Sequence, residues 1–281
     1  MSDTPHCYRH AGRETRVSCS ECGRPICEDC MTFAPVGIRC PDHANVGAVK
    51  PTPARTVQSV RRRTRAAAAP ATMVLIAINA LVYVITAAQG GGPNLPGGQL
   101  FADWALQGAS VANGDGWRLV TAMFLHGSLL HLAFNMFALY WLGNVIEQAL
   151  GTPRFVLLYV VSGLAGSAGA LWFSAAFAVT VGASGAIFGL IGALLILEYR
   201  ATGSFMGQAM ILILVNFAFT FAVPGISKGG HIGGLIGGIA ATYALEQYRE
   251  GPRQKVGVLL AVGVGVLSLV LAYVRVQSYV L

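Results

Sequence analysis

The sequence predicts an all-α, polytopic membrane helical bundle that follows a small cysteine-rich domain. Of its 281 residues, 54% are hydrophobic and only 11% are charged, whereas soluble domains carry roughly 25% charged residues. Mean hydropathy is +0.60. All six cysteines precede residue 41, and eleven of the 19 lysines and arginines precede residue 66. We therefore expect a cysteine-rich domain at 1–45, a Pro- and Arg-rich linker at 46–70 and a membrane domain at 71–281.

The cysteines of the first part form four pairs with histidines or with one another, always with a two-residue spacer. Eight ligands are enough for two tetrahedral zinc ions, and a closed four-ligand site is structural. Three disulfides are the alternative, but they rarely persist in the cytoplasm, where the cationic residues place this end and where no signal peptide is expected to lead it out. We therefore predict a small N-terminal zinc-binding domain whose folding energy comes from the metal. The pairs are Cys7-x-x-His10, Cys19-x-x-Cys22, Cys27-x-x-Cys30 and Cys40-x-x-His43.

The order of these pairs resembles a B-box-type zinc finger over about 40 residues. In that family the pairs interleave, the first with the third and the second with the fourth. The resemblance implies one zinc site made of Cys7, His10, Cys27 and Cys30, and a second made of Cys19, Cys22, Cys40 and His43. Three roles stay open for this domain: it recruits a cytosolic protein partner, it regulates the membrane domain, or it only stabilises the N-terminus.

The linker ends in the cluster Arg61-Arg62-Arg63-x-Arg65, which we expect to bind anionic headgroups of membrane lipids. The net charge of +7 comes largely from the cysteine-rich domain and the linker. Membrane orientation explains this charge better than nucleic-acid binding does, so no nucleic acid is expected as a partner.

Hydropathy predicts seven membrane helices. The stretch 90–116 is too rich in glycine and polar residues to span a membrane, and 155–197 holds two helices with a break near 178–181. The predicted spans are 71–89, 119–146, the two within 155–197, 201–227, 229–245 and 256–274.

Lysines and arginines predict the orientation of these spans. With the N-terminus in the cytoplasm, sixteen lie on the inner side and only three, Arg118, Lys228 and Arg275, on the outer side. We therefore expect a multi-pass protein of the plasma (cell) membrane with a cytoplasmic N-terminus. In this topology the second, fourth and sixth helices all run inward, so residues near their starts share a depth just below the outer surface.

A serine and a histidine occupy two of these helix starts. Ser184, in Gly182-Ala183-Ser184-Gly185, opens an apolar helix where unpaired N–H groups and the helix dipole favour an oxyanion. His231 opens a later helix, and glycines on both helices allow a close approach. The pair predicts a Ser-His dyad, because Glu147 and Glu198 lie at the inner ends of helices. Helix packing by small residues alone and a small transporter are the alternatives.

Polar residues on the second span predict the remainder of this site. His131 and Asn135 lie four residues apart on one helix face and can stabilise an oxyanion together with the N–H of Ser184. The alternative is an interhelical hydrogen bond. Phe188, one turn after Ser184, is expected to pack against the imidazole of His231. His126 is expected to have a structural or loop-anchoring role.

Four motifs in order make residues 71–281 resemble the rhomboid intramembrane serine proteases. They are Trp117-Arg118, His126-x4-His131-x3-Asn135, Gly182-Ala183-Ser184-Gly185 and His231-x-x-Gly234-x-x-x-Gly238.

The resemblance implies a six-helix rhomboid core plus one C-terminal helix. It implies Ser184 as nucleophile, His231 as base, His131 and Asn135 as oxyanion stabilisers, and cleavage of transmembrane protein substrates near the outer face. No metal or cofactor is expected for catalysis. Phe188 departs from the tyrosine that is common in bacterial members, which removes a hydroxyl. An inactive rhomboid-like binding or trafficking factor is the alternative.

Overall fold

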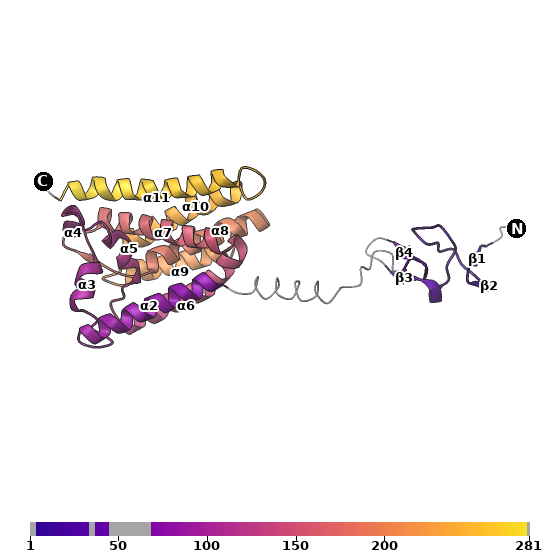
Figure 1. Cartoon of the computed structure of the whole chain (residues 1–281), viewed down its shortest axis with the longest axis horizontal. Coiled ribbons are helices and arrows are strands. Elements are labelled where there is room, and N and C mark those ends of the chain that lie inside the picture. The colour runs from indigo at the N-terminus through magenta and orange to yellow at the C-terminus, as the bar shows by residue number, and fades with distance from the viewer. Residues whose placement is uncertain (1–3, 34–36, 45–68, 280–281) are drawn as a thin grey trace. The chain divides into compact units, whose positions relative to one another are not determined.

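The computed structural model describes residues 4–33, 37–44 and 69–279. The chain separates into two compact units, residues 1–63 and 64–281 (Figure 1). Positions 46–68 of the predicted linker, with the arginine cluster, lie outside the described residues.

The N-terminal unit is a small fold of short strands. Strand β1 (His6–Cys7) pairs antiparallel with β2 (His10–Glu14), and β3 (Thr32–Phe33) pairs antiparallel with β4 (Ile38–Arg39). A short 3-10 helix, η1 (Glu28–Cys30), precedes β3. Apart from Ile26, the buried residues of its hydrophobic cluster are all cysteines. Such a core buries too little apolar surface to hold the fold without further cross-links or metal.

The second unit is helical, and five of its helices are long and apolar enough to cross a membrane: α2, α6, α7, α8 and α11. The predicted helical membrane fold is therefore confirmed. Helix α9 is a shorter apolar helix of 15 residues, and α10 contains the glycine-rich His231 segment. The long helices are α2 (Pro70–Gln89), α6 (Leu129–Leu150), α7 (Thr152–Phe173), α8 (Ser184–Thr202), α9 (Gln208–Ala222), α10 (Lys228–Gln247) and α11 (Gln254–Gln277).

Short elements connect the long helices at one end of the bundle. The polar stretch after α2 contains α3 (Gly98–Trp104), β5 (Leu106–Gln107) and α4 (Gly108–Ala112). It leads to α5 (Arg118–Thr121) and the 3-10 helix η2 (Ala122–Phe124). Strand β5 pairs antiparallel with β6 (Val179–Thr180), which precedes α8.

The second predicted span, 119–146, was wrong in its first part. The chain forms α5 and η2, leaves the helix, and starts α6 only at Leu129. Ser128 is the reason, because its Oγ accepts a hydrogen bond from the N–H of His131 at 3.2 Å and caps a new helix. His126 consequently lies before this helix, while His131 and Asn135 lie in its first two turns.

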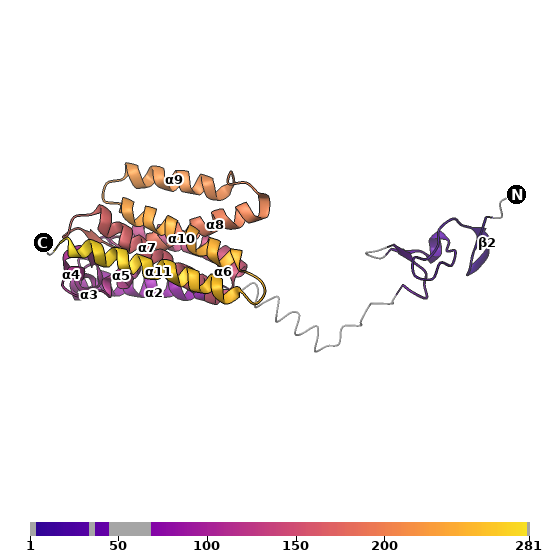
Figure 2. The same cartoon turned by 90° about the horizontal axis from the view of Figure 1, so that it is seen from above.

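Glycine contacts bring the central helices together. A Cβ at Gly234 of α10 would collide with the carbonyl of Gly185 of α8, and one at Gly238 would collide with the backbone of Gly189. Such contacts allow backbones to approach more closely than any larger side chain permits. Helix α9 lies at the edge of the bundle (Figure 2) and buries only Ala209, Ile213 and Thr220.

Candidate active site and metal-binding clusters

The loop before α8 fixes the position of Ser184. Its strand β6 pairs with β5, and the N–H of Gly182 donates to the carbonyl of Ala122 at 2.9 Å. Gly182 has a φ of +127°, a conformation that side-chain-bearing residues rarely adopt. Ser184 is then the first residue of α8, so its N–H is among those that no carbonyl of the same helix accepts.

Ser184 and His231 form a direct hydrogen bond. His231 Nε2 lies 2.9 Å from Ser184 Oγ, across the glycine contact between α8 and α10. His231 is buried in the first turn of α10, a helix capped by Ser227, whose Oγ accepts from the N–H of Gly230 at 3.1 Å. The geometry suits transfer of the serine proton to the imidazole.

Two further side chains hold the imidazole of His231. The ring of Phe188 stacks on it with centroids 4.0 Å apart and an interplanar angle of 18°, which is the packing expected from the sequence. On the other edge of the ring, Nδ1 lies 2.7 Å from Oγ1 of Thr220, which belongs to α9. Thr220 was not predicted from the sequence, since no local signal separates one threonine in an apolar helix from another.

Glu147 and Glu198, which lie near the ends of α6 and α8, have hydrogen-bond partners outside the site. Glu147 accepts hydrogen bonds at the start of α2, from the N–H groups of Ala71 and Thr72 at 3.0 and 2.8 Å. Glu198 accepts from the N–H of Ala209 at 3.0 Å. Among the described residues, the hydrogen-bond partners of the His231 ring nitrogens are Ser184 and Thr220.

The structure brings His131 beside the serine loop. A Cβ at Gly182 would lie 2.9 Å from both Cε1 and Nε2 of the His131 ring. The N–H of Gly127 points to Nδ1 of the same ring at 3.4 Å, which assigns the ring hydrogen to Nε2, the atom that faces the serine loop. Asn135 is buried and donates one amide hydrogen to the carbonyl of His131 at 2.8 Å, which leaves its second amide hydrogen for another acceptor.

His126 is fully buried against His131, with ring centroids 5.0 Å apart in an edge-on arrangement. Neither ring nitrogen of His126 has a hydrogen-bond partner among the described residues. His126 therefore contacts the site through packing of its ring against His131, just before α6 begins.

Trp117 and Arg118 fix the loop that precedes the site. Arg118 Nε donates to Asp115 at 2.9 Å, and Nη1 donates to the carbonyls of Ala102 and Ala105 at 2.5 and 2.9 Å. The indole N–H of Trp117 donates to a third carbonyl of the same stretch, at 3.1 Å. The loop is thereby held against α5, close to the β5–β6 pair that positions Ser184.

A small cavity of about 30 Å³ adjoins Ser184. Its walls come from β5, η2, α7, the serine loop, α8 and the start of α10, and they include Met123, Gly163, Ser167 and Gly182. A volume of this size is enough for one water molecule or a small group.

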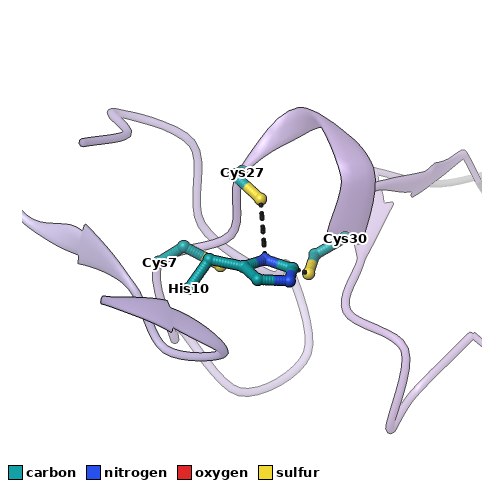
Figure 3. Close-up of side chains that lie close together, drawn as sticks. All are labelled: Cys7, His10, Cys27 and Cys30. Atoms are coloured by element: carbon teal, nitrogen blue, oxygen red, sulfur yellow. Dashed lines mark hydrogen bonds between the residues drawn. The ribbon is translucent and has the colours of Figure 1, made fainter. Parts of the chain in front are cut away.

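The eight candidate zinc ligands of the N-terminal unit form two groups in the interleaved order. Cys7, His10, Cys27 and Cys30 form one group (Figure 3), and Cys19, Cys22, Cys40 and His43 form the other. In each group the ligand atoms lie within 4.8 Å of one another.

The distances within these groups fit a tetrahedral metal. His10 Nδ1 lies 3.2 Å from Cys27 Sγ and 3.4 Å from Cys30 Sγ, and His43 Nδ1 lies 3.2 Å from Cys40 Sγ. Ligands of one zinc ion are separated by about 3.5–3.8 Å, given Zn–S of about 2.3 Å and Zn–N of about 2.0 Å. None of the six cysteines forms a disulfide in the structure, and each of the two Cys/His groups could hold a metal ion.

The pKa of the Cys19 thiol lies below its ordinary value. Burial raises its pKa, but hydrogen bonds from backbone N–H groups, that of Cys40 first among them, outweigh burial and lower the pKa to about 6. A thiolate is the form that binds zinc.

Comparison with known proteins identifies the membrane unit. Residues 113–248 match the model of the Rhomboid domain. The chain is 37% identical over 204 residues to the rhomboid protease GluP of Bacillus subtilis, covering 70% of this chain and 39% of GluP. It is 37% identical over 163 residues to RHOMBOID-like protein 5 of Arabidopsis thaliana, covering 55% of this chain and 51% of that protein.

A shorter relative is matched over most of its length. The Bacillus subtilis rhomboid protein YdcA is 37% identical over 145 residues, which cover 72% of YdcA and 50% of this chain. The chain thus spans about two fifths of GluP and about half of RHOMBOID-like protein 5.

The fold and these relatives together define a multi-pass membrane protein of an intramembrane protease family. The chain belongs to the rhomboid family, as its four sequence motifs indicated.

Proposed function

We propose that this protein is a serine endopeptidase that cleaves transmembrane protein substrates through a dyad of Ser184 and His231. The observation that carries the proposal is the 2.9 Å hydrogen bond between Ser184 Oγ and His231 Nε2 inside a bundle of apolar helices. A hydroxyl is a weak nucleophile until a base takes its proton, and His231 is placed to do this.

The reaction follows from these positions. Ser184 Oγ attacks the carbonyl carbon of the scissile peptide bond while its proton passes to Nε2 of His231. The imidazolium then gives that proton to the leaving amine nitrogen, and the C–N bond breaks to leave an ester on Ser184. Water hydrolyses this ester, with His231 again taking a proton and returning it to Ser184.

The negative charge of the tetrahedral intermediate needs hydrogen-bond donors near Ser184. The N–H of Ser184 and Nε2–H of His131 are the nearest candidates, with the second amide hydrogen of Asn135 as a third. Loss of one such donor typically lowers kcat by about 100-fold to 1,000-fold. His131→Ala and Asn135→Ala are therefore expected to reduce kcat with a smaller effect than loss of Ser184.

The N-terminal unit is proposed to carry two structural Zn²⁺ ions, one in each Cys/His group. Zinc there supplies folding energy and takes no part in peptide cleavage. Under this proposal residues 1–45 are a separate domain, tethered by a linker to the membrane domain at 71–281.

Lysine and arginine are in excess on the side of the membrane that holds the N-terminus, which supports a cytoplasmic N-terminus. Ser184 then lies near the outer face of the plasma membrane. If α9 and α10 cross the membrane together with the five longer apolar helices, seven spans place the end of α11 outside. A reporter enzyme that is active only outside the cytoplasm, fused after residue 281, is expected to be active. Activity of a cytoplasm-dependent reporter at the same position would refute this orientation.

The test of the activity uses the purified full-length protein in lipid vesicles with a transmembrane substrate. Wild type is expected to cleave the substrate, while Ser184→Ala and His231→Ala, each shown to be folded by thermal unfolding, are expected to give no detectable product. Equal cleavage by all three proteins would refute the dyad. No cleavage by the wild type of any member of a panel of transmembrane substrates would favour a binding or trafficking role.

A further inference from the structure

The far edge of the His231 ring has a partner that the dyad alone does not require. Nδ1 of His231 lies 2.7 Å from Oγ1 of Thr220, and the Thr220 side chain is fully buried. Thr220 comes from α9, whereas Ser184 and His231 come from α8 and α10. Three helices therefore meet at one imidazole.

The hydrogen of the Thr220 hydroxyl is already used. Oγ1 of Thr220 donates to the carbonyl of Asn216, one turn earlier in α9, at 2.7 Å. A hydroxyl has one hydrogen and two acceptor lone pairs, so toward His231 the oxygen of Thr220 can only accept. The hydrogen in the 2.7 Å contact must therefore belong to Nδ1 of His231.

This assignment determines the tautomer of the imidazole. A neutral imidazole has hydrogen on only one of its two nitrogens, and if that nitrogen is Nδ1, then Nε2 has a free lone pair. Nε2 is the atom that faces Ser184 Oγ at 2.9 Å. We propose that Thr220 is a positioning residue that selects the Nδ1–H tautomer of His231 and keeps Nε2 available as the base. The proposal rests on the proposed Ser184–His231 chemistry.

The surroundings of the ring support this role. Phe188 of α8 stacks on one face of His231, and Phe217 of α9 packs on Phe188 with centroids 5.5 Å apart. Stacking controls the plane of the ring, but it does not distinguish one ring nitrogen from the other. In serine hydrolases with a triad a carboxylate makes that distinction, and here the neutral oxygen of Thr220 occupies the corresponding place.

A structural alternative has to be separated from this role. Threonine hydroxyls in membrane helices often bond to the carbonyl one turn earlier without any function. Thr242 is a matched control, because it is fully buried in α10 and its hydroxyl makes no hydrogen bond within the described part of the chain. Thr242→Val removes a buried hydroxyl from the same bundle, away from Ser184 and His231.

The kinetic experiment compares kcat and KM for a transmembrane substrate in wild type, Thr220→Val, Thr220→Ser and Thr242→Val, with Ser184→Ala as the blank. Thr220→Val is expected to lower kcat by roughly 10-fold to 100-fold, the effect of leaving one buried donor unpaired. KM should stay unchanged, Thr220→Ser should recover most of kcat, and Thr242→Val should match wild type. Wild-type kcat in Thr220→Val would overturn the proposal, and so would a serine variant as impaired as the valine variant.

The second readout is the tautomer itself, measured by ¹⁵N NMR of histidine-labelled protein, with the His231 signals assigned by their loss in His231→Ala. The expected result is Nδ1–H in wild type and in Thr220→Ser, with Nε2–H gaining population in Thr220→Val. An Nε2–H imidazole in the wild type would overturn the proposal even if the valine variant does not fold. Cleavage by Ser184→Ala would instead refute the proposed function, a result that the Thr220 variants cannot produce.

Discussion

The contact between α8 and α10 at Gly234 predicts how strongly activity depends on helix spacing. A methyl group at position 234 would lie 2.7 Å from the carbonyl carbon and 3.0 Å from Cα of Gly185, and nearer still to the carbonyl oxygen. Non-bonded carbons prefer a separation of about 3.5–4.0 Å, so Gly234→Ala should push the two helices apart by about 1 Å. Backbone atoms on both sides leave no flexible side chain to absorb the overlap.

This displacement acts directly on the dyad. Ser184 adjoins Gly185 on α8, and His231 lies one turn before Gly234 on α10. A separation of about 1 Å would lengthen the Oγ–Nε2 distance from 2.9 Å to about 4 Å, beyond hydrogen-bonding range. Misplacement of a catalytic group by that amount costs about 100-fold in rate. We therefore expect Gly234→Ala to lose about 100-fold in kcat and about 1–3 kcal/mol of stability through overpacking.

The assay measures kcat with a transmembrane substrate and thermal unfolding of the same preparations. Gly263→Ala is the matched control, because a Cβ at Gly263 in α11 meets no atom within 4 Å. The control should behave as wild type in both measurements. Activity of Gly234→Ala equal to that of the control would refute the claim that the glycine contact sets the distance between Ser184 and His231.

Three further predictions concern other parts of the chain. Glu147→Gln should destabilise the membrane unit by about 3 kcal/mol, because the buried carboxylate accepts hydrogen bonds at the start of α2. In thermal unfolding, a loss of stability no larger than that of Glu198→Gln would contradict this. The full-length protein should contain two zinc ions per chain by elemental analysis, and Cys27→Ser should retain one; equal zinc in both would refute the site. Phe188→Ala should lower kcat roughly 10-fold through loss of ring stacking, whereas Phe188→Tyr should keep it; equal kcat in the two variants would exclude a positioning role.

The helical membrane fold was predictable from hydropathy, because apolar runs of about 20 residues have few other uses. The region before α6 departs from the prediction, and α9 (Gln208–Ala222) is shorter than the predicted span 201–227. Residues 119–146 contain no Asp, Glu, Lys or Arg, so hydropathy predicted one continuous span. Ser128, however, caps a new helix and separates α5 and η2 from α6. A capping serine is a local signal that an average over a long window does not register.

The candidate site was predictable where its parts are local patterns. The glycines near Ser184 and His231 indicate a close helix contact, and the stacking of Phe188 follows from its place one turn after the serine. Thr220 was not predictable, because its contact with His231 depends on where α9 lies in the bundle. The spacing of His131 and Asn135 on one helix face also did not predict that one amide hydrogen of Asn135 bonds to the carbonyl of His131.

The most direct test of the central claim is covalent labelling of the full-length protein with a fluorophosphonate, followed by peptide mass spectrometry. A serine activated by an adjacent base reacts with such a reagent, while ordinary hydroxyls do not. We predict a single adduct, on Ser184, that forms far more slowly in His231→Ala and is absent in Ser184→Ala. An adduct on another residue, or labelling of Ser184 at the wild-type rate in His231→Ala, would contradict the claim that His231 activates Ser184.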